Sequence, residues 1–205
     1  MFKDISRRNL LRGLSLSALA GSSAGLVTLQ AAQDAHHAVS EDKNAAGGAY
    51  VPKSFNDHEY KTLQRLSDLI IPADEHSPGA LAAGAADWID FMSSNCDELR
   101  EIFTGGMAWV DHDMQRRYGT DFLSASAEQQ TAMLDRIGIE KNAAPENQPG
   151  IHFFHWARNL VLDAYYTSPI GIKELGYMGN QVVGEFKVPE EALAYALKRS
   201  PFAKA

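Results

Sequence analysis

The chain has 205 residues, which suits one domain with tails, and 45% of them are hydrophobic, enough to build a core. Its formal net charge is −7 at pH 7. Because nucleic-acid binding needs clustered basic residues, no nucleic-acid partner is expected. The single cysteine, Cys96, excludes a disulfide within the chain. Free cysteine is usually found in the interior, so Cys96 is predicted to be a buried small hydrophobe rather than half of an intermolecular bridge.

The first 32 residues have the pattern of a twin-arginine export signal. Arg7 and Arg8 are followed by two leucines and a mildly apolar run rich in Gly and Ser. That run is shorter than the roughly 20 apolar residues of a spanning helix. Ala31 and Ala32 are candidate cleavage positions. The alternative is a cytoplasmic amphipathic helix with a chance arginine pair. We therefore expect a signal peptide over 1–32 and a periplasmic protein.

Residues 33–54 are polar and rich in Ala and Gly, without an apolar period. This composition predicts a flexible arm in the isolated chain. The adjacent His36 and His37 could pick up a metal ion adventitiously, but no further ligands stand near them in the sequence. The remaining segment, 55–205, is expected to form the folded domain.

The first predicted helix begins at Asn56, which can form a capping box with Glu59. Phe55 and Tyr60 are placed for a hydrophobic staple, and Pro72 forces the chain out of the helix. A second helix carries a group of large apolar side chains: Trp88, Ile89, Phe91 and Met92.

The third predicted helix spans about 97–118 and ends at Gly119. Its Gly105-Gly106 pair predicts a kink or a close helix crossing. Ser126 with Gln129 opens the next helix.

A strongly apolar helix over about 151–166, which carries Trp156, is expected to be central and the most buried of the helices. The tail from 171 to 188 is punctuated by glycine and predicted to be irregular, and 190–199 is predicted to form a last short helix. Strand alternation is absent throughout, so the fold class predicted is all-α.

A polar loop separates the first two helices. Asp74, Glu75, His76, Ser77 and Pro78 lie in it, between two apolar elements, so the loop is expected to present its polar tip to solvent. Contact with a partner protein or fixing of the loop is the favoured role for these five residues, ahead of simple solvation. Two carboxylates and an imidazole could also bind a metal ion or move protons, but three consecutive loop residues point in different directions.

Two other polar groups have the same ambiguity. His152 and His155 share a helix face and could ligate a metal or haem, although interfacial histidines are the simpler interpretation. Asp111, His112 and Asp113 are interpreted as a solvated face.

The Gly-rich dinucleotide and phosphate loops, the serine nucleophile elbow and a C-x-x-C-H haem motif do not occur in the sequence. We therefore expect this chain to hold no catalytic, cofactor-binding or metal-binding residues of its own.

Two stretches carry a resemblance to a known family. The first reads I-P-A-D-E-H-S-P-G-A over 71–80 and A-G-A-A-D-W-I-D over 83–90; the second covers 165–169 and 174–180. A weaker third match joins Arg117, Tyr118, Gly119 and Phe122 to Gln129 and Gln130. Over roughly 55–186 the chain resembles the gluconate 2-dehydrogenase subunit 3 family, the small subunits of membrane-associated, FAD-dependent sugar and sugar-acid dehydrogenases.

The resemblance implies a non-catalytic small subunit of a periplasmic complex. Its partner would be a large flavoprotein that binds FAD and, commonly, a cytochrome c subunit that carries haem c. The small subunit would stabilise the flavoprotein and lend it the export signal, and the complex would associate with the membrane. Two alternatives remain: an independent metal-dependent enzyme using Asp74, His76 or the His152 and His155 pair, and a stand-alone periplasmic interaction protein.

Overall fold

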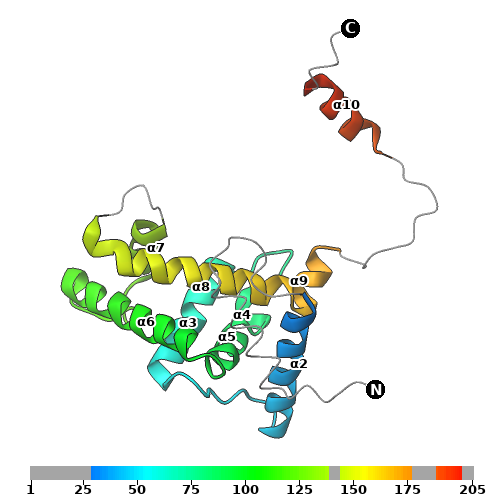
Figure 1. The fold of residues 1–205 in the computed structure, drawn as a ribbon. Helices are drawn as coiled ribbons and strands as arrows, with labels where there is room; N and C mark the ends of the chain where they lie inside the picture. The colour runs from blue at the N-terminus through cyan, green and yellow to red at the C-terminus, as the bar shows by residue number, and fades with distance from the viewer. Residues whose placement is uncertain (1–28, 139–143, 177–187, 200–205) are drawn as a thin grey trace.

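The computed structural model describes residues 29–138, 144–176 and 188–199, and the regular structure in those ranges is helical throughout (Figure 1). The α-helices are α2 (Leu29–Ala45), α3 (Asp57–Ile70), α4 (Gly79–Ala82), α5 (Ala85–Ser93), α6 (Asp97–Tyr118), α7 (Ala127–Gly138), α8 (Gln148–Tyr166), α9 (Pro169–Glu174) and α10 (Glu190–Arg199). A short 3-10 turn, η2 (Pro145–Asn147), precedes α8. The predicted all-α class is confirmed. Within the described part, no helix is long and apolar enough to cross a membrane.

Helix α8 is the centre of the body, as predicted. It packs against α3, α4, α5, α6, α7 and α9, and Figure 1 shows it running through the middle of the bundle. Trp156 itself is only partly buried and packs against the core. The tryptophan with no exposed surface is Trp88 of α5.

Glycines let α6 and α8 cross closely. A Cβ atom added at Gly106 of α6 would lie 2.1 Å from Cδ2 of Phe153, and one added at Gly150 of α8 would lie 2.0 Å from Cζ3 of Trp109. A Cβ at Gly105 would meet nothing within 4 Å. The Gly105-Gly106 pair therefore marks a close crossing, one of the two outcomes predicted for it, and Gly106 is the residue that allows it.

Two local helix signals in the sequence are confirmed. Asn56 accepts the N–H of Glu59 at 3.0 Å while the Glu59 carboxylate accepts the N–H of Asn56 at 2.9 Å, which completes the capping box. Gly119 ends α6 in the left-handed conformation with φ 71°. Cys96, directly before α6, is buried as predicted. Helix α10 has the predicted bounds, whereas the tail is not irregular throughout, since α9 occupies its start.

The expected flexible arm is wrong over its first part, because residues 33–45 belong to helix α2. Ala31, Ala32, Ala35 and Val39 are buried, and the indole N–H of Trp88 donates to the carbonyl of Ala32 at 3.3 Å. These small side chains let the α2 backbone approach α5 closely. One side of α2 is therefore buried although most of its residues are polar. Helix α2 also starts inside the expected signal peptide, whereas Arg7 and Arg8 lie outside the described residues.

Two carboxylates of α5 hold the N-terminal part of the described chain: Asp90 binds the segment between α2 and α3, and Asp87 binds α2 and α3 themselves. Asp90 has no exposed surface and accepts four hydrogen bonds, from the Tyr50 hydroxyl at 2.8 Å and the backbone N–H groups of Lys53, Ser54 and Phe55 at 2.8–3.0 Å. Asp87 accepts from Lys43 at 2.6 Å and from Tyr60. Because backbone donors satisfy Asp90 in the interior, the chain between α2 and α3 is fixed against α5.

Candidate functional site

The polar loop predicted between α3 and α5 has a fixed backbone. Helix α3 ends at Ile70, before Pro72, and the N–H of Ala80 donates back to the carbonyl of Ile71 at 2.9 Å. Asp74 organises the tip, since its carboxylate accepts the N–H groups of His76 at 2.8 Å and Ser77 at 2.7 Å. These two hydrogen bonds lower the pKa of Asp74 below its ordinary value.

Ser77 anchors the loop to the body. Its side chain is buried and its hydroxyl shares a hydrogen bond with the hydroxyl of Tyr165 in α8, which in turn donates to the carboxylate of Glu174 in α9. A Cβ at Gly79 would lie 2.6 Å from the backbone nitrogen of Ala73, and Gly79 has φ 76°, so the turn requires glycine. The loop is therefore held from both ends.

The tip of the loop is exposed, as predicted. Asp74, Glu75, His76 and Pro78 face solvent, whereas Ser77 does not. Glu75 and His76 lie 3.4 Å apart with side chains that are 86% and 78% exposed. No group of three or more potential metal ligands occurs in the described residues. The tip therefore presents an exposed carboxylate and an exposed imidazole side by side.

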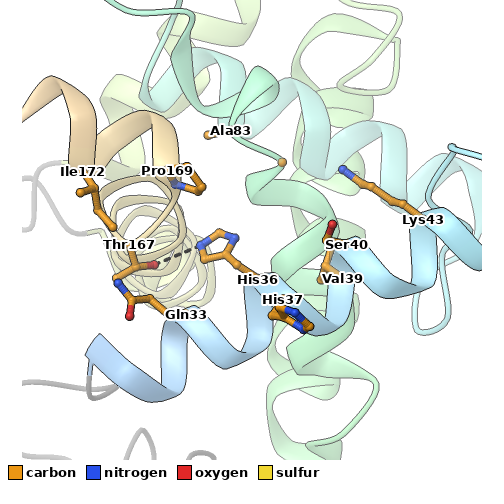
Figure 2. A pocket seen from close by; sticks show the side chains of 11 residues that line it. Gln33, His36, His37, Val39, Ser40, Lys43, Ala83, Thr167, Pro169 and Ile172 are labelled. Atoms are coloured by element: carbon orange, nitrogen blue, oxygen red, sulfur yellow. Dashed lines mark hydrogen bonds between the residues drawn. The ribbon is translucent and has the colours of Figure 1, made fainter.

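A pocket of about 490 Å³ lies between α2, the start of α5 and the junction of α8 with α9. Figure 2 shows His36 of α2 directed toward Thr167, whose hydroxyl lies 3.1 Å from Nε2 of His36. Val39, Pro169 and Ile172 supply apolar walls. This pocket was not predicted from the sequence, because one of its walls is the helix that was expected to be a flexible arm.

Burial controls the charge of the pocket histidine. Desolvation lowers the pKa of His36 to about 4, a hydrogen bond with the backbone of Ala164 opposes this, and the charge of Lys43 adds to it. His36 is therefore neutral at pH 7. Its ring centroid lies 5.9 Å from that of Trp88. The ammonium group of Lys43 is already paired with Asp87, so the pocket combines apolar walls with a neutral polar floor.

A family model described as gluconate 2-dehydrogenase subunit 3 matches residues 57–185, more than half of the chain. The chain belongs to this family. No curated protein and no solved structure matches it. The two sequence stretches that resemble the subunit 3 family meet in the structure, because Ser77 comes from the first and Tyr165 and Glu174 come from the second. The contact that fixes the loop thus joins the two stretches on which the resemblance was based.

The other histidines that the sequence analysis considered as ligands do not form a common site in the described part of this subunit 3 protein. His152 lies 3.3 Å from the indole nitrogen of Trp156, and His155 lies 3.1 Å from the amide of Asn159, so each exposed histidine pairs along α8 rather than with the other. His37 of α2 is exposed beside Glu41. These histidines have local partners and form no metal site within the described residues.

The prediction of a solvated face for Asp111, His112 and Asp113 is wrong for Asp113. Its side chain is 2% exposed and is paired with three arginines: Arg116, Arg117 and Arg136. Burial raises the pKa of Asp113, but hydrogen bonds from Arg116 and Arg117 and the charge of Arg136 outweigh it and hold the pKa below its ordinary value. Asp111 pairs with His58 at 2.6 Å. This cluster joins α6 to α7 and is structural.

The structural roles of Asp87 and Asp90 were not predicted, although both residues stand in the A-G-A-A-D-W-I-D stretch. The available signal was two carboxylates three residues apart on an otherwise apolar helix. Their partners come from up to 44 residues away in the chain, at Lys43, so the sequence alone did not show what they hold.

Proposed function

We propose that this chain is the non-catalytic small subunit of an FAD-dependent dehydrogenase complex that oxidises a CH–OH group of a sugar or sugar acid. It stabilises the large flavoprotein subunit. A cytochrome c subunit with haem c accepts the electrons in this scheme. Membership of the gluconate 2-dehydrogenase subunit 3 family supports the assignment to a dehydrogenase complex.

The observation that carries the docking role is the fixed and exposed loop at 74–78. A loop that orders itself before binding loses little conformational entropy on binding. Ser77 is bonded to Tyr165 inside the body, while Glu75 and His76 stay exposed. The large subunit is therefore expected to contact the loop tip, and to do so without rearranging the body.

FAD is assigned to the large subunit, because the pocket beside α2 does not suit it. A diphosphate needs several free N–H donors or cations. The ammonium group of Lys43 in this pocket is paired with the Asp87 carboxylate at 2.6 Å, and His36 is held neutral. The negative charge of the Asp87 carboxylate, which lies beside Lys43, would also repel a phosphate.

Export by the twin-arginine route is part of the proposal and rests on Arg7 and Arg8 in the sequence. This route would carry the small subunit and its bound flavoprotein together to the periplasm. Changing both residues to Lys is expected to leave both proteins in the cytoplasm. Delivery of the Arg7→Lys, Arg8→Lys variant to the periplasm at the wild-type level would contradict the export role.

Co-expression tests the docking role. The wild-type chain is expected to convert a poorly soluble flavoprotein of the same host into a soluble, yellow, dye-reducing complex. The Glu75→Ala, His76→Ala variant removes the tip and leaves the Asp74 turn, so it is expected to lower complex yield without changing the flavin chemistry of the complex that forms.

Asp74→Ala removes the acceptor of two backbone hydrogen bonds and is expected to lower yield further, because the loop then loses its shape. The matched control is Glu101→Ala, His112→Ala, which removes one exposed carboxylate and one exposed imidazole from α6. Equal yields for the tip variant and this control would refute contact through the loop.

A further inference from the structure

The pocket beside α2 has no part in the proposed function, and its size is that of a small-molecule site. Its volume of about 490 Å³ lies within the range of about 300–1,000 Å³ that such sites occupy. The lining residues of α2 run from Gln33 to Lys43, which is about 15 Å of helix at roughly 1.5 Å per residue. The pocket is therefore elongated along one face of α2.

The walls of the pocket are mostly apolar. Val39 comes from α2, Ala83 from the turn before α5, and Pro169 and Ile172 from α9. A sugar that enters such a pocket would lose the hydrogen bonds that water makes to its hydroxyl groups, and these four side chains replace none of them. The pocket therefore suits a mostly apolar molecule rather than the sugar that the proposed complex oxidises.

The charges beside the pocket compensate each other. Among the described residues that line it, Lys43 carries a permanent charge, and its ammonium group lies 2.6 Å from the Asp87 carboxylate. A carboxylate in the pocket would be repelled by Asp87, an ammonium group would be repelled by Lys43, and either ion would give up its hydration. The occupant is therefore expected to be uncharged.

The hydrogen bonds around His36 determine which of its ring nitrogens is left for a ligand. The hydroxyl of Thr167 donates its hydrogen to the carbonyl of Asp163 at 2.6 Å, so its oxygen accepts from Nε2 of His36 at 3.1 Å. The backbone carbonyl of Ala164, in the same last turn of α8, also accepts from this histidine. The ring hydrogen therefore sits on Nε2, and Nδ1 keeps a lone pair. Figure 2 shows this second nitrogen on the side of the ring away from Thr167.

The lone pair on Nδ1 selects the polar group of the ligand. A wholly apolar molecule would displace water from this nitrogen without replacing its hydrogen bond, and this weakens binding. A hydroxyl group donates to Nδ1 of His36, and its oxygen can also accept from the amide of Gln33, which lies one turn away on the same face of α2. An uncharged hydroxyl group is therefore the polar group that fits both lining residues.

We propose that this pocket binds an elongated, uncharged aliphatic alcohol. Its hydroxyl group donates to Nδ1 of His36, and its aliphatic chain lies against Val39, Pro169 and Ile172. This inference goes beyond the proposed function and does not rest on it, because every residue that carries it belongs to this chain.

The test titrates four probes into the full-length chain at pH 7 by isothermal titration calorimetry. The probes share an eight-carbon chain and differ in the head group: 1-octanol, 1-methoxyoctane, octanoate and octylammonium. One molecule of 1-octanol is expected to bind per chain. 1-Methoxyoctane lacks the hydroxyl hydrogen and is expected to bind about tenfold more weakly, as are the two ions.

His36→Phe tests the acceptor, because it removes both ring nitrogens and keeps a flat ring. It is expected to weaken binding of 1-octanol about tenfold and to leave that of 1-methoxyoctane within about threefold of wild type. A purely structural effect would weaken both probes alike. His37→Phe makes the same change at a neighbouring side chain that is 76% exposed, and both probes should then bind as they do to the wild-type chain.

Ala83→Leu tests the location, because the larger side chain takes up part of the pocket. It is expected to weaken binding of 1-octanol and 1-methoxyoctane alike, by about tenfold or more. Circular dichroism checks that each variant folds. The comparison of head groups uses the wild-type chain alone, so it tests the proposal independently of any variant.

Four results would overturn the proposal. The first is the absence of 1-octanol binding to the wild-type chain. Equal affinities for 1-octanol and 1-methoxyoctane would exclude recognition of a hydroxyl group, and tighter binding of octanoate or octylammonium would indicate an ion site at Lys43 and Asp87 instead. Unchanged binding of 1-octanol by folded Ala83→Leu would place the probe elsewhere on the chain. None of these results bears on the large subunit, so the proposed function is tested separately.

Discussion

Replacing the two neighbouring glycines of α6 with alanine is expected to change stability in opposite directions. At Gly105 the new methyl group meets no atom within 4 Å. At Gly106 it would lie 2.1 Å from Cδ2, 2.2 Å from Cγ and 2.6 Å from Cβ of Phe153. These ring and Cβ atoms are close to the α8 backbone, so Phe153 cannot simply swing aside.

The magnitudes follow from helix propensity and packing. Alanine is favoured over glycine in a helix by about 1 kcal/mol, so Gly105→Ala should stabilise the chain by roughly 0.5–1 kcal/mol. Gly106→Ala gains the same propensity but overpacks a core contact, which costs about 1–3 kcal/mol and occasionally more. Because the overlap with Phe153 is deep, the upper part of that range applies, and the net loss should be about 1–2 kcal/mol.

Thermal unfolding followed by circular dichroism at 222 nm measures both changes. At about 2–4 °C per kcal/mol for a chain of this size, Gly105→Ala should raise Tm by roughly 2 °C and Gly106→Ala should lower it by roughly 3–6 °C. Adding Phe153→Leu to Gly106→Ala should recover part of its packing loss. An equal rise in Tm for the two single variants would refute the close crossing of α6 and α8.

Three further predictions concern the core and the N-terminal helix. Trp88→Ala should cost about 3–5 kcal/mol in urea unfolding, clearly more than Trp156→Ala, because only Trp88 is fully buried; equal costs would contradict this. Asp113→Asn should cost about 1–3 kcal/mol at pH 7. Since the folded-state pKa of Asp113 is lowered, its contribution is fully present above about pH 5 and is lost as the pH falls through the folded-state value, so the difference in unfolding free energy should shrink toward pH 3. If the exported chain is processed, its intact mass should still include Ala32, because that residue is buried and accepts the Trp88 indole N–H; a mature chain that begins at Gln33 would contradict this.

Local signals in the sequence predicted much of the helical framework. The capping box of Asn56 and Glu59 and the helix end at Gly119 depend only on residues close together in the sequence. The start of α3 and the end of α6 could therefore be placed from the sequence. The exposed tip of the 74–78 loop was likewise predictable, because Pro72 stops α3 at Ile70 and polar turn residues follow it. Membership of the family also followed from short stretches such as 71–80.

Features that depend on distant partners could not be predicted. Ala32 and Val39 form a stripe with few apolar atoms, and only the surface of α5 shows why they are buried. The carboxylate of Asp113 resembles a surface residue until Arg136, 23 residues away, is placed beside it. The bond between Ser77 and Tyr165 joins residues 88 positions apart, so the anchor of the loop was invisible in the sequence.

The most direct test of the account is purification of the tagged chain from its native host, with mass spectrometry of its partners and assay of each fraction with a sugar-acid or sugar substrate and an artificial electron acceptor. We expect a large flavoprotein to co-purify, with flavin absorbance and dye reduction confined to fractions that contain both proteins. Dye reduction by the chain free of flavoprotein, or its purification without any flavoprotein, would contradict the account.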